Sequence, residues 1–247
     1  MAYSSAKNIQ ISMNQLISVI IPTHNRSNTI SATLDSLFSQ SYNNIEIIVV
    51  DDGSTDQTEN VLSKYESRIK IVKQKNAGSN AARNRGFKDS TGEYILFSDD
   101  DICWESNAIE TMLNALMYDN GASFAYCRFK LGWKKFKLRE FNSGTLKKIN
   151  YIHTSSLMRR ADFPGFDESL QRFQDWDLWL TLLENGKRGV FVKKVLFKIR
   201  TDNPITKSTW LPSYAYRLPW KIINWKPKSI ASYEKAKAIV QKKHGIM

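Results

Sequence analysis

Three consecutive aspartates, Asp99, Asp100 and Asp101, follow the apolar run Tyr94–Phe97. A short apolar run bounded by polar residues is typical of a buried strand, so these carboxylates stand where the strand ends. Adjacent like charges raise one another's pKa unless a positive charge lies among them. Mg²⁺ and Mn²⁺ bind oxygen ligands, commonly one or two protein carboxylates together with water and substrate phosphates. We therefore predict a divalent-cation site that holds a diphosphate.

The elements that position these carboxylates alternate regularly through the first hundred residues. Apolar runs predict strands at 16–21, 45–50, 69–72 and 94–97, and helix-like segments lie between them at 29–39, 57–66 and 76–87. Apolar strands separated by helices indicate parallel βαβ units with both sheet faces covered, so the fold class is α/β with a doubly wound, mostly parallel sheet. Ligands of such sheets bind outside the carboxyl ends of the strands, which places the loops PTHNR, DDGSTD and SDDD on one rim.

The pattern changes after Ala122. The alternating stretch 122–138 predicts one or two antiparallel strands, followed by a helix from about Gln174 to Gly186 and a strand at 190–199. A basic helix is expected over 230–243. We divide the chain into a tail (1–15), a domain (16–205) and a basic, aromatic C-terminal extension (206–247). Within the domain, 16–104 contains the parallel βαβ units, and 105–205 is a smaller part with antiparallel strands.

Positive charge is concentrated late in the chain. The formal net charge is +12, yet residues 187–247 contain only two acids, Asp202 and Glu234. This asymmetry indicates an anionic partner, whether a nucleic acid, a phosphorylated ligand or a membrane surface. The two cysteines, Cys103 and Cys127, suggest neither a disulfide framework nor a metal knuckle, so we expect a reducing compartment. We see no signal peptide in the first 15 residues and no apolar run near the ~20 residues that span a bilayer.

Five motifs occur in a characteristic order: SVIIPTHNR, IIVVDDGSTD, NAGSNAARNRGF, GEYILFSDDDI and GFDESLQRFQDWDLWLTL. Together they resemble the family 2 glycosyltransferases, which have the GT-A nucleotide-sugar fold. The resemblance extends from about Ile17 to Arg200, which is most of the chain. A single Asp-x-Asp is a weak signal, whereas five motifs in the family's order and spacing are specific.

The resemblance implies a nucleotide site and a metal site on the rim. His24 would stack on the base, Asp52 would accept hydrogen bonds from it, and Arg83 would meet phosphate, with Asn84 near the nucleotide. Asp99 and Asp101 would be the metal pair for Mn²⁺ or Mg²⁺, with Asp101 in direct contact, while Asp100 would point elsewhere, toward ribose or a backbone amide. The nucleotide-binding set is Pro22, Thr23, His24, Arg26, Asp52, Arg83, Asp99 and Asp100. The alternative for His24 is a loop histidine bonded to backbone. For Ser54, Thr55 and Asp56 we favour plain turn and cap roles.

Sugar transfer also needs a base that deprotonates the acceptor hydroxyl. The resemblance assigns this role to Asp175 in QDWD, at the start of the predicted helix, although many relatives have Glu where this chain has Gln174. Asp177 is the rival acid, and its alternative role is a solvated helix-face or cap residue. A base opposite the leaving diphosphate implies direct displacement with inversion at the anomeric carbon.

The predicted lid differs from that of many relatives, and the acceptor side has fewer candidate residues. Many relatives carry a lid histidine near the end of the core, but IRTDNPITKS has none, so Arg200 or Lys207 would neutralise the diphosphate. His153 would lie near Asp175, in a structural or a sugar-contacting role, and Trp176 would offer a flat face to a pyranose ring or pack in the core. The Lys-rich extension contains Trp210, Trp220 and Trp225. It predicts docking to an anionic membrane surface near lipid-linked acceptors, against the alternative of a solvated tail packed on its own domain.

The sequence thus predicts an inverting, metal-dependent glycosyltransferase of surface-glycan synthesis, cytoplasmic or peripheral on the inner face of the plasma membrane. Its donor would be a nucleoside diphosphate sugar, most commonly a uridine diphosphate sugar in the family, and its acceptor a saccharide or lipid-linked hydroxyl. A sugar-nucleotide nucleotidyltransferase would need a glycine-rich phosphate loop, which IPTHNRSN lacks. A nucleic-acid-binding protein would fit the pI of about 9.6, but the acidic rim contradicts it, so we expect no nucleic-acid partner. The intact Asp99, Asp101 and Asp175 argue against a non-catalytic homologue.

Overall fold

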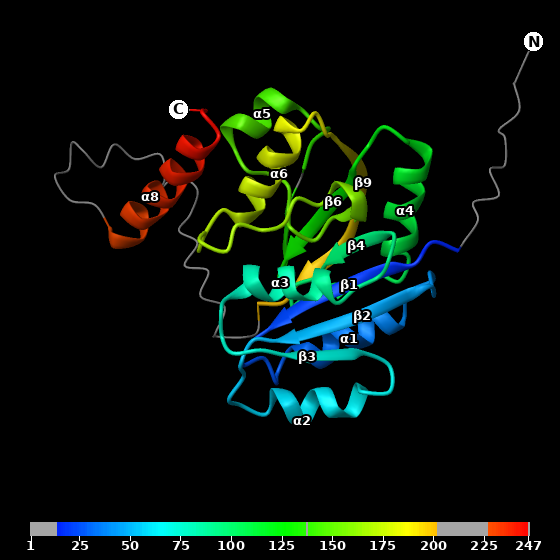
Figure 1. Cartoon of the computed structure of the whole chain (residues 1–247). Coiled ribbons are helices and arrows are strands. Elements are labelled where there is room, and N and C mark those ends of the chain that lie inside the picture. Colours follow the sequence, from blue (N-terminus) through cyan, green and yellow to red (C-terminus); the bar gives the residue numbers. More distant parts are fainter. Residues whose placement is uncertain (1–13, 137, 202–226, 247) are drawn as a thin grey trace, which may run out of the picture.

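The computed structural model describes residues 14–136, 138–201 and 227–246, and in this part of the chain one nine-stranded sheet forms the centre of the molecule (Figure 1). Its strand order is β3-β2-β1-β4-β8-β6-β9-β5, and β7 pairs with β6. The first four strands are parallel to one another and are the predicted ones: β1 (Ile17–Thr23), β2 (Ile45–Asp51), β3 (Lys70–Lys73) and β4 (Tyr94–Phe97). Their carboxyl ends therefore form one rim.

Helices cover both faces of this parallel half, as the apolar runs predict. They are α1 (Ile30–Phe38), α2 (Thr58–Leu62) with the 3₁₀ turn η1 (Ser63–Tyr65), and α3 (Ser79–Lys88). Alternate β1 side chains point to opposite faces, so Val19 and Ile21 join the cluster that contains α1, while Ile20 faces α3. Gly86 allows α3 to approach closely, because a Cβ there would lie 2.4 Å from Cγ2 of Ile20.

The second half of the sheet is mixed. Its elements are β5 (Ile102–Trp104), α4 (Ala108–Tyr118), β6 (Phe124–Leu131), β7 (Lys134–Phe136), α5 (Ser143–Lys148), β8 (Leu157–Arg159), η2 (Arg160–Asp162), α6 (Gln174–Glu184) and β9 (Gly189–Ile199). β6 is antiparallel to β7 and β8 but parallel to β9. The chain leaves the aspartate cluster at the end of β4 and pairs β5 with β9 at the far end of the strand order. The sheet therefore curls, and the end of β9 returns to the cluster.

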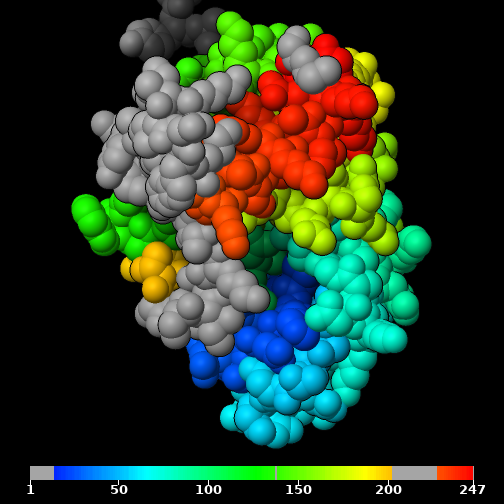
Figure 2. Space-filling model, turned by 90° about the vertical axis from the view of Figure 1, so that its left-hand side faces the viewer, coloured from blue at the N-terminus to red at the C-terminus, as the bar shows by residue number. Residues whose placement is uncertain are grey.

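The terminal helix α8 (Lys228–Lys243) occupies the region where the sequence predicts a helix over 230–243. Its last turn bonds to α6, since Lys243 and His244 contact Asp177. On the face shown in Figure 2, the surface is hollowed between the blue and cyan N-terminal segments and the orange start of α8. In the part of the chain that the structure describes, no helix is long and apolar enough to cross a membrane. Trp210, Trp220 and Trp225 of the extension lie outside the described residues.

Candidate active site

Two arginines, from two other segments of the rim, neutralise part of the aspartate cluster. Arg83 of α3, whose side chain is 5% exposed, donates to Oδ1 of Asp99 over 2.7 Å. Arg26, in the loop after β1, donates from Nε to Oδ1 of Asp100 over 3.3 Å. Oδ1 of Asp100 thus points to a guanidinium, and the expected contact of this carboxylate with ribose stays a prediction. Among the described residues, neither Arg26 nor Arg83 forms an ion pair with Asp101.

The pKa values of the three carboxyls show where positive charge is lacking. Burial raises the pKa of Asp99, but Arg83, His153 and Arg26 together outweigh it, so the net pKa lies below the usual value. Burial raises the pKa of Asp100 to about 6, against the opposing charge of Arg26. The pKa of Asp101 rises to about 7, because burial and the charges of Asp99 and Asp100 all favour its neutral form. A cation beside Asp101 would reverse this effect.

The donor set fits a divalent ion that is shared with a diphosphate. Among the described residues, no group of three or more His, Cys, Asp and Glu side chains is arranged as a protein-only cage. Mg²⁺ typically uses one or two carboxylates and substrate phosphates rather than such a cage. Asp101 suits that mode, because negative charge is in excess around it. So does the carboxylate oxygen of Asp99 that Arg83 does not contact.

The loops after β1 and β2 form the adjoining part of the rim. Nδ1 of His24 lies 2.9 Å from the backbone oxygen of Asp52, so Nδ1 donates and Nε2 is free to accept, as from Nδ2 of Asn25 over 3.2 Å. The ring is nevertheless exposed, which leaves it accessible to a base. The backbone-bonded alternative and base stacking are therefore compatible. Pro22 and Thr23 are buried in the last residues of β1, where they shape the loop from below.

Asp52 is more constrained than the sequence suggests. Its Oδ1 accepts from Nε2 of Gln74 and from the Ala77 amide over 2.7 and 2.8 Å, and its Oδ2 accepts from the Gly78 amide over 2.8 Å. The carboxylate thereby ties the loop before α3 to the end of β2. One acceptor position is left for a base N–H, so the nucleoside contact stays a prediction.

Neighbouring residues of α3 have different roles. Asn84 was expected near the nucleotide, but its side chain donates to the Phe166 oxygen over 2.9 Å and accepts from the Phe166 amide over 2.8 Å. It therefore fixes the loop that precedes α6. Arg85 is the expected surface residue and pairs with Asp89 over 2.6 Å. Only Arg83 points to the cluster.

His153 interacts electrostatically with both Asp175 and the aspartate cluster. Asp175 lies in the first turn of α6, half-buried, and burial raises its pKa above the usual value. Burial lowers the pKa of the His153 ring and favours its neutral form, although the charges of Asp99 and Asp175 act in the opposite direction. Its Nδ1 accepts from the Ser155 amide over 3.1 Å, so the proton of the neutral ring sits on Nε2. The predicted base and the predicted metal carboxylates thus share a neighbour.

Phe173 and Asp177 determine how α6 begins. Phe173 adopts a left-handed conformation, with φ of 60°, just before the helix, which is unusual for a bulky residue. Asp177 was considered as a rival base or a solvated residue. Instead it is 4% exposed and bonds to Lys243 and His244, with 2.8 Å to Nζ of Lys243. Asp177 therefore attaches α8 to α6. Asp175 is the other acid in this turn, and it faces the rim cluster.

The remaining acceptor and lid candidates separate clearly. Trp176 is 1% exposed and donates from Nε1 to the Leu146 oxygen over 2.7 Å, so it packs in the core and cannot stack on a sugar. Its position in the first turn of α6 suggested the rim, but the ring points inward. Arg200 follows β9, and its amide donates to the Asp101 oxygen over 2.9 Å, beside the cluster. Lys207 lies outside the described residues.

Comparison with known proteins identifies the family. The family model described as glycosyl transferase family 2 matches residues 18–169, more than half of the chain. The chain belongs to glycosyltransferase family 2. The match includes the rim and the aspartate cluster, and the chain is accordingly a transferase.

Two relatives illustrate the range of the family. An uncharacterised glycosyltransferase of Rickettsia typhi is 32% identical over 82% of this chain and 69% of its own length. Escherichia coli WfgD, a UDP-Glc:α-D-GlcNAc-diphosphoundecaprenol β-1,3-glucosyltransferase, is 38% identical over 69% of this chain and 71% of its own length. Other family members are much longer, and the chain spans only 31% of a glycosyltransferase from Rickettsia felis.

Solved structures agree on the GT-A fold. S. aureus TarS 1–349 has a TM-score of 0.64 at 25% identity, over 74% of this chain and 60% of TarS. The Pyrobaculum calidifontis mannosyltransferase PcManGT, in complex with GDP-Man and Mn²⁺, has a TM-score of 0.60 at 19% identity, over 93% of this chain and 69% of that one. The predicted fold class is confirmed.

Proposed function

We propose that this chain transfers a sugar from a uridine diphosphate donor to a hydroxyl of a lipid-linked saccharide, with inversion at the anomeric carbon. The observations that carry the proposal are the bond from Arg83 to Asp99 and the electrostatic interaction of His153 with both Asp99 and Asp175. They support a diphosphate site at the aspartate cluster, with Asp175 as the base on the same rim. The substrate classes are suggested by WfgD, whose name gives a UDP-glucose donor and a diphosphoundecaprenol acceptor, and by TarS, which has been solved with UDP-GlcNAc.

On the donor side, His24 stacks on the base and Asp52 accepts from it. Arg26 and Arg83 favour the ionised forms of Asp100 and Asp99, and Asp101 and Asp99 would hold Mn²⁺ or Mg²⁺. When bound, the ion neutralises charge that develops on the leaving diphosphate. Arg200, tied to the backbone of Asp101, adds positive charge there in place of a lid histidine.

On the acceptor side, Asp175 takes the proton of the acceptor hydroxyl as its oxygen bonds to the anomeric carbon. The bond between that carbon and the diphosphate oxygen breaks, and nucleoside diphosphate leaves on the opposite face. The raised pKa of Asp175 makes it a stronger base than an exposed aspartate. His153 is neutral, so it does not add a second acid beside Asp175. The enzyme acts at the cytoplasmic face of the membrane that holds the lipid.

Asp175→Asn tests the mechanism, because the amide keeps the shape of the side chain but cannot accept the proton. We expect the transfer rate to fall ~10²–10⁴-fold, with little change in UDP-sugar affinity. Asp35→Asn, on the exposed face of α1, makes the same chemical change away from the rim and should be neutral. Transfer from UDP-glucose to a short-chain GlcNAc-diphospholipid is measured, and NMR gives the product configuration. Normal turnover in Asp175→Asn, or a retained configuration, would refute the mechanism.

A further inference from the structure

The turn between β6 and β7 places a tryptophan in solvent. Leu131 pairs with Lys134, which leaves Gly132 and Trp133 as a two-residue hairpin turn. Gly132 has φ of +56°, as a turn with glycine at its first central position requires. Trp133 is 97% exposed, although most large apolar side chains of the described residues are buried. The ring therefore contributes nothing to the packing of this domain.

A row of lysines crosses the sheet beside that tip. Lys130 of β6 is in register with Lys135 of β7 and with Lys198 of β9, and all three are exposed. Like charges in register repel one another and destabilise a sheet. Within the described segments, these three lysines form no ion pair. This positive surface is uncompensated within the described part of the domain.

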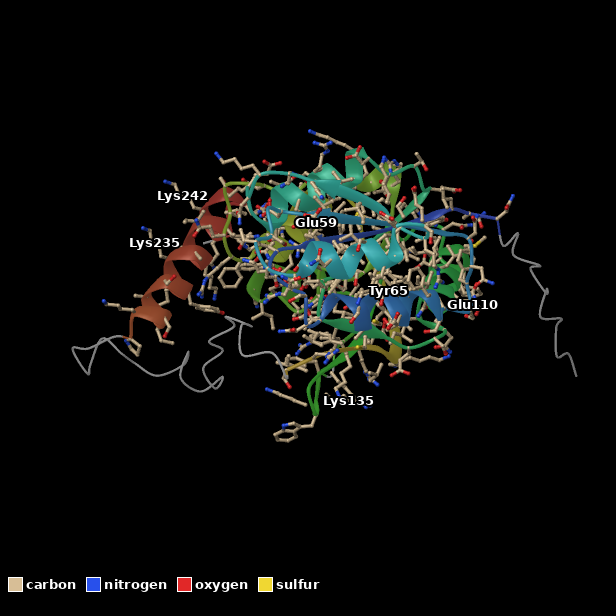
Figure 3. All side chains as sticks on the ribbon, turned by 90° about the horizontal axis from the view of Figure 1, so that it is seen from below. Glu59, Tyr65, Glu110, Lys135, Lys235 and Lys242 are labelled. Carbon is tan, nitrogen blue, oxygen red and sulfur yellow. The ribbon has the colours of Figure 1, made fainter. Side chains whose placement is uncertain are left out.

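The neighbouring row makes this surface rigid. Phe136, Phe129 and Phe197 stack across β7, β6 and β9, with ring centroids 4.6 and 5.2 Å apart. Because strand side chains alternate between faces, the aromatic row packs inward and the lysine row faces out. The hairpin is thus a fixed projection, visible around Lys135 at the lower edge of Figure 3. On that view it points away from the direction taken by Lys235 and Lys242 of α8.

The projection lies next to the active-site rim. Leu131 is in register with Ile199, which is in turn in register with Ile102. The Gly132 amide donates to the Ile199 oxygen over 3.1 Å, and the next residue, Arg200, donates to the Asp101 oxygen over 2.9 Å. A surface that contacts Trp133 would therefore also lie beside the metal end of the site.

We propose that Trp133 and the lysines 130, 135 and 198 form a membrane anchor that binds the headgroup layer of an anionic bilayer. Indole rings favour the headgroup level, and each basic side chain near an anionic surface strengthens binding about fivefold. The lysine row supplies the charge complementarity, which a neutral saccharide ring would not need. The anchor deepens the proposed function and rests on its lipid-linked acceptor, because it would hold the rim next to the lipid surface.

Sedimentation with vesicles tests the anchor in the full-length protein. The vesicles contain 30% phosphatidylglycerol in phosphatidylcholine, or phosphatidylcholine alone. For the triple variant Trp133→Ser, Lys130→Gln, Lys135→Gln, we expect at least a tenfold loss of affinity for the anionic vesicles, with thermal unfolding unchanged. The matched control, Lys64→Gln with Lys88→Gln, removes the same charge at exposed lysines on other elements and should lose less than threefold.

A water-soluble GlcNAc diphosphate acceptor separates docking from chemistry, and the triple variant should transfer to it within twofold of the wild type. Equal vesicle affinity in the triple variant and the wild type would overturn the anchor. So would an equal loss in the lysine control, which would indicate net charge alone. A large loss with the soluble acceptor would identify Trp133 as a saccharide contact and would also overturn it. If the wild type transfers no sugar but binds vesicles through the hairpin, the proposed function fails while the anchor stands.

Discussion

The acids of the parallel half of the sheet and those of the mixed half find their bonding partners in different parts of the chain. In the parallel half, local loops satisfy the acids: Asp52 holds the loop before α3, and Arg83 of α3 holds Asp99. In the mixed half, Asp177 is satisfied by Lys243, which lies 66 residues further along the chain. Donor-side geometry is therefore built into successive βαβ units. Acceptor-side geometry depends on a terminal helix that has to dock.

The largest expected effect lies in the parallel half, at Asp101. Asp101→Asn removes the carboxylate that neither Arg26 nor Arg83 pairs with in the described structure, so binding of UDP in the presence of Mn²⁺ should fall by at least tenfold while the fold persists. In the wild type, a pKa of about 7 means that protons compete with the metal. Affinity should therefore decrease as the pH falls below about 7, because a protonated carboxyl is a poor ligand.

Calorimetry of UDP with and without Mn²⁺, from pH 8 to pH 6, measures both effects. Asp35→Asn is again the control for loss of one exposed carboxylate. Metal-dependent binding of unchanged strength in Asp101→Asn would remove this residue from the site. The difference between the two halves would then be clearer, because metal binding in the parallel half would depend on Asp99 alone.

How far the sequence predicts the molecule follows the same division. The helix expected at 29–39 is observed at Ile30–Phe38, because its apolar spacing and its flanking turns are local. The start of α6 at Gln174 is equally local. The inward direction of Trp176 depends on the Leu146 oxygen of another helix, so spacing alone could not reveal it.

Contacts between distant segments account for the other differences. The link from Asp99 to His153 requires the curl of the sheet, and the role of Asp177 requires α8. One signal was available for Asp177, since an acid inside an apolar helix face needs a cationic partner. The sequence does not say which of its many lysines provides it.

A smaller effect is expected at Gly86, where the parallel half is packed most tightly. In Gly86→Ala the new methyl would lie 2.4 Å from Cγ2 of Ile20 and 3.1 Å from Cγ2 of Val50. Overpacking costs about 1–3 kcal/mol, and alanine's better helix propensity offsets up to about 1 kcal/mol of this. The matched control is Gly144→Ala in α5, where the methyl meets only Oδ1 of Asn142 at 3.5 Å.

Urea unfolding of both variants gives the free energies of unfolding. We expect Gly86→Ala to be destabilised and Gly144→Ala to be neutral or more stable. Destabilisation of both variants by the same amount would show that the difference in packing between the Gly86 and Gly144 sites has no energetic counterpart.

The smallest effect concerns the docking of α8 in the mixed half. The Lys243 ammonium, 2.7 Å from Oδ2 of Asp167, together with Ser169, lowers the pKa of that carboxyl to about 2. A carboxyl whose pKa is lower in the folded state adds stability above its unfolded pKa of about 3.8, and the contribution disappears as the pH falls through about 2. Because solvent reaches the pair, we expect no more than about 1 kcal/mol.

Asp167→Asn should thus reduce the free energy of unfolding at pH 7, and its difference from the wild type should shrink between pH 4 and pH 2. Lys243→Gln is the partner control in a double-mutant cycle, although it also loses the contact with Asp177. Hydrogen exchange of the α8 amides reports the docking directly, and a difference between Asp167→Asn and the wild type that is independent of pH would exclude this ion pair as its cause.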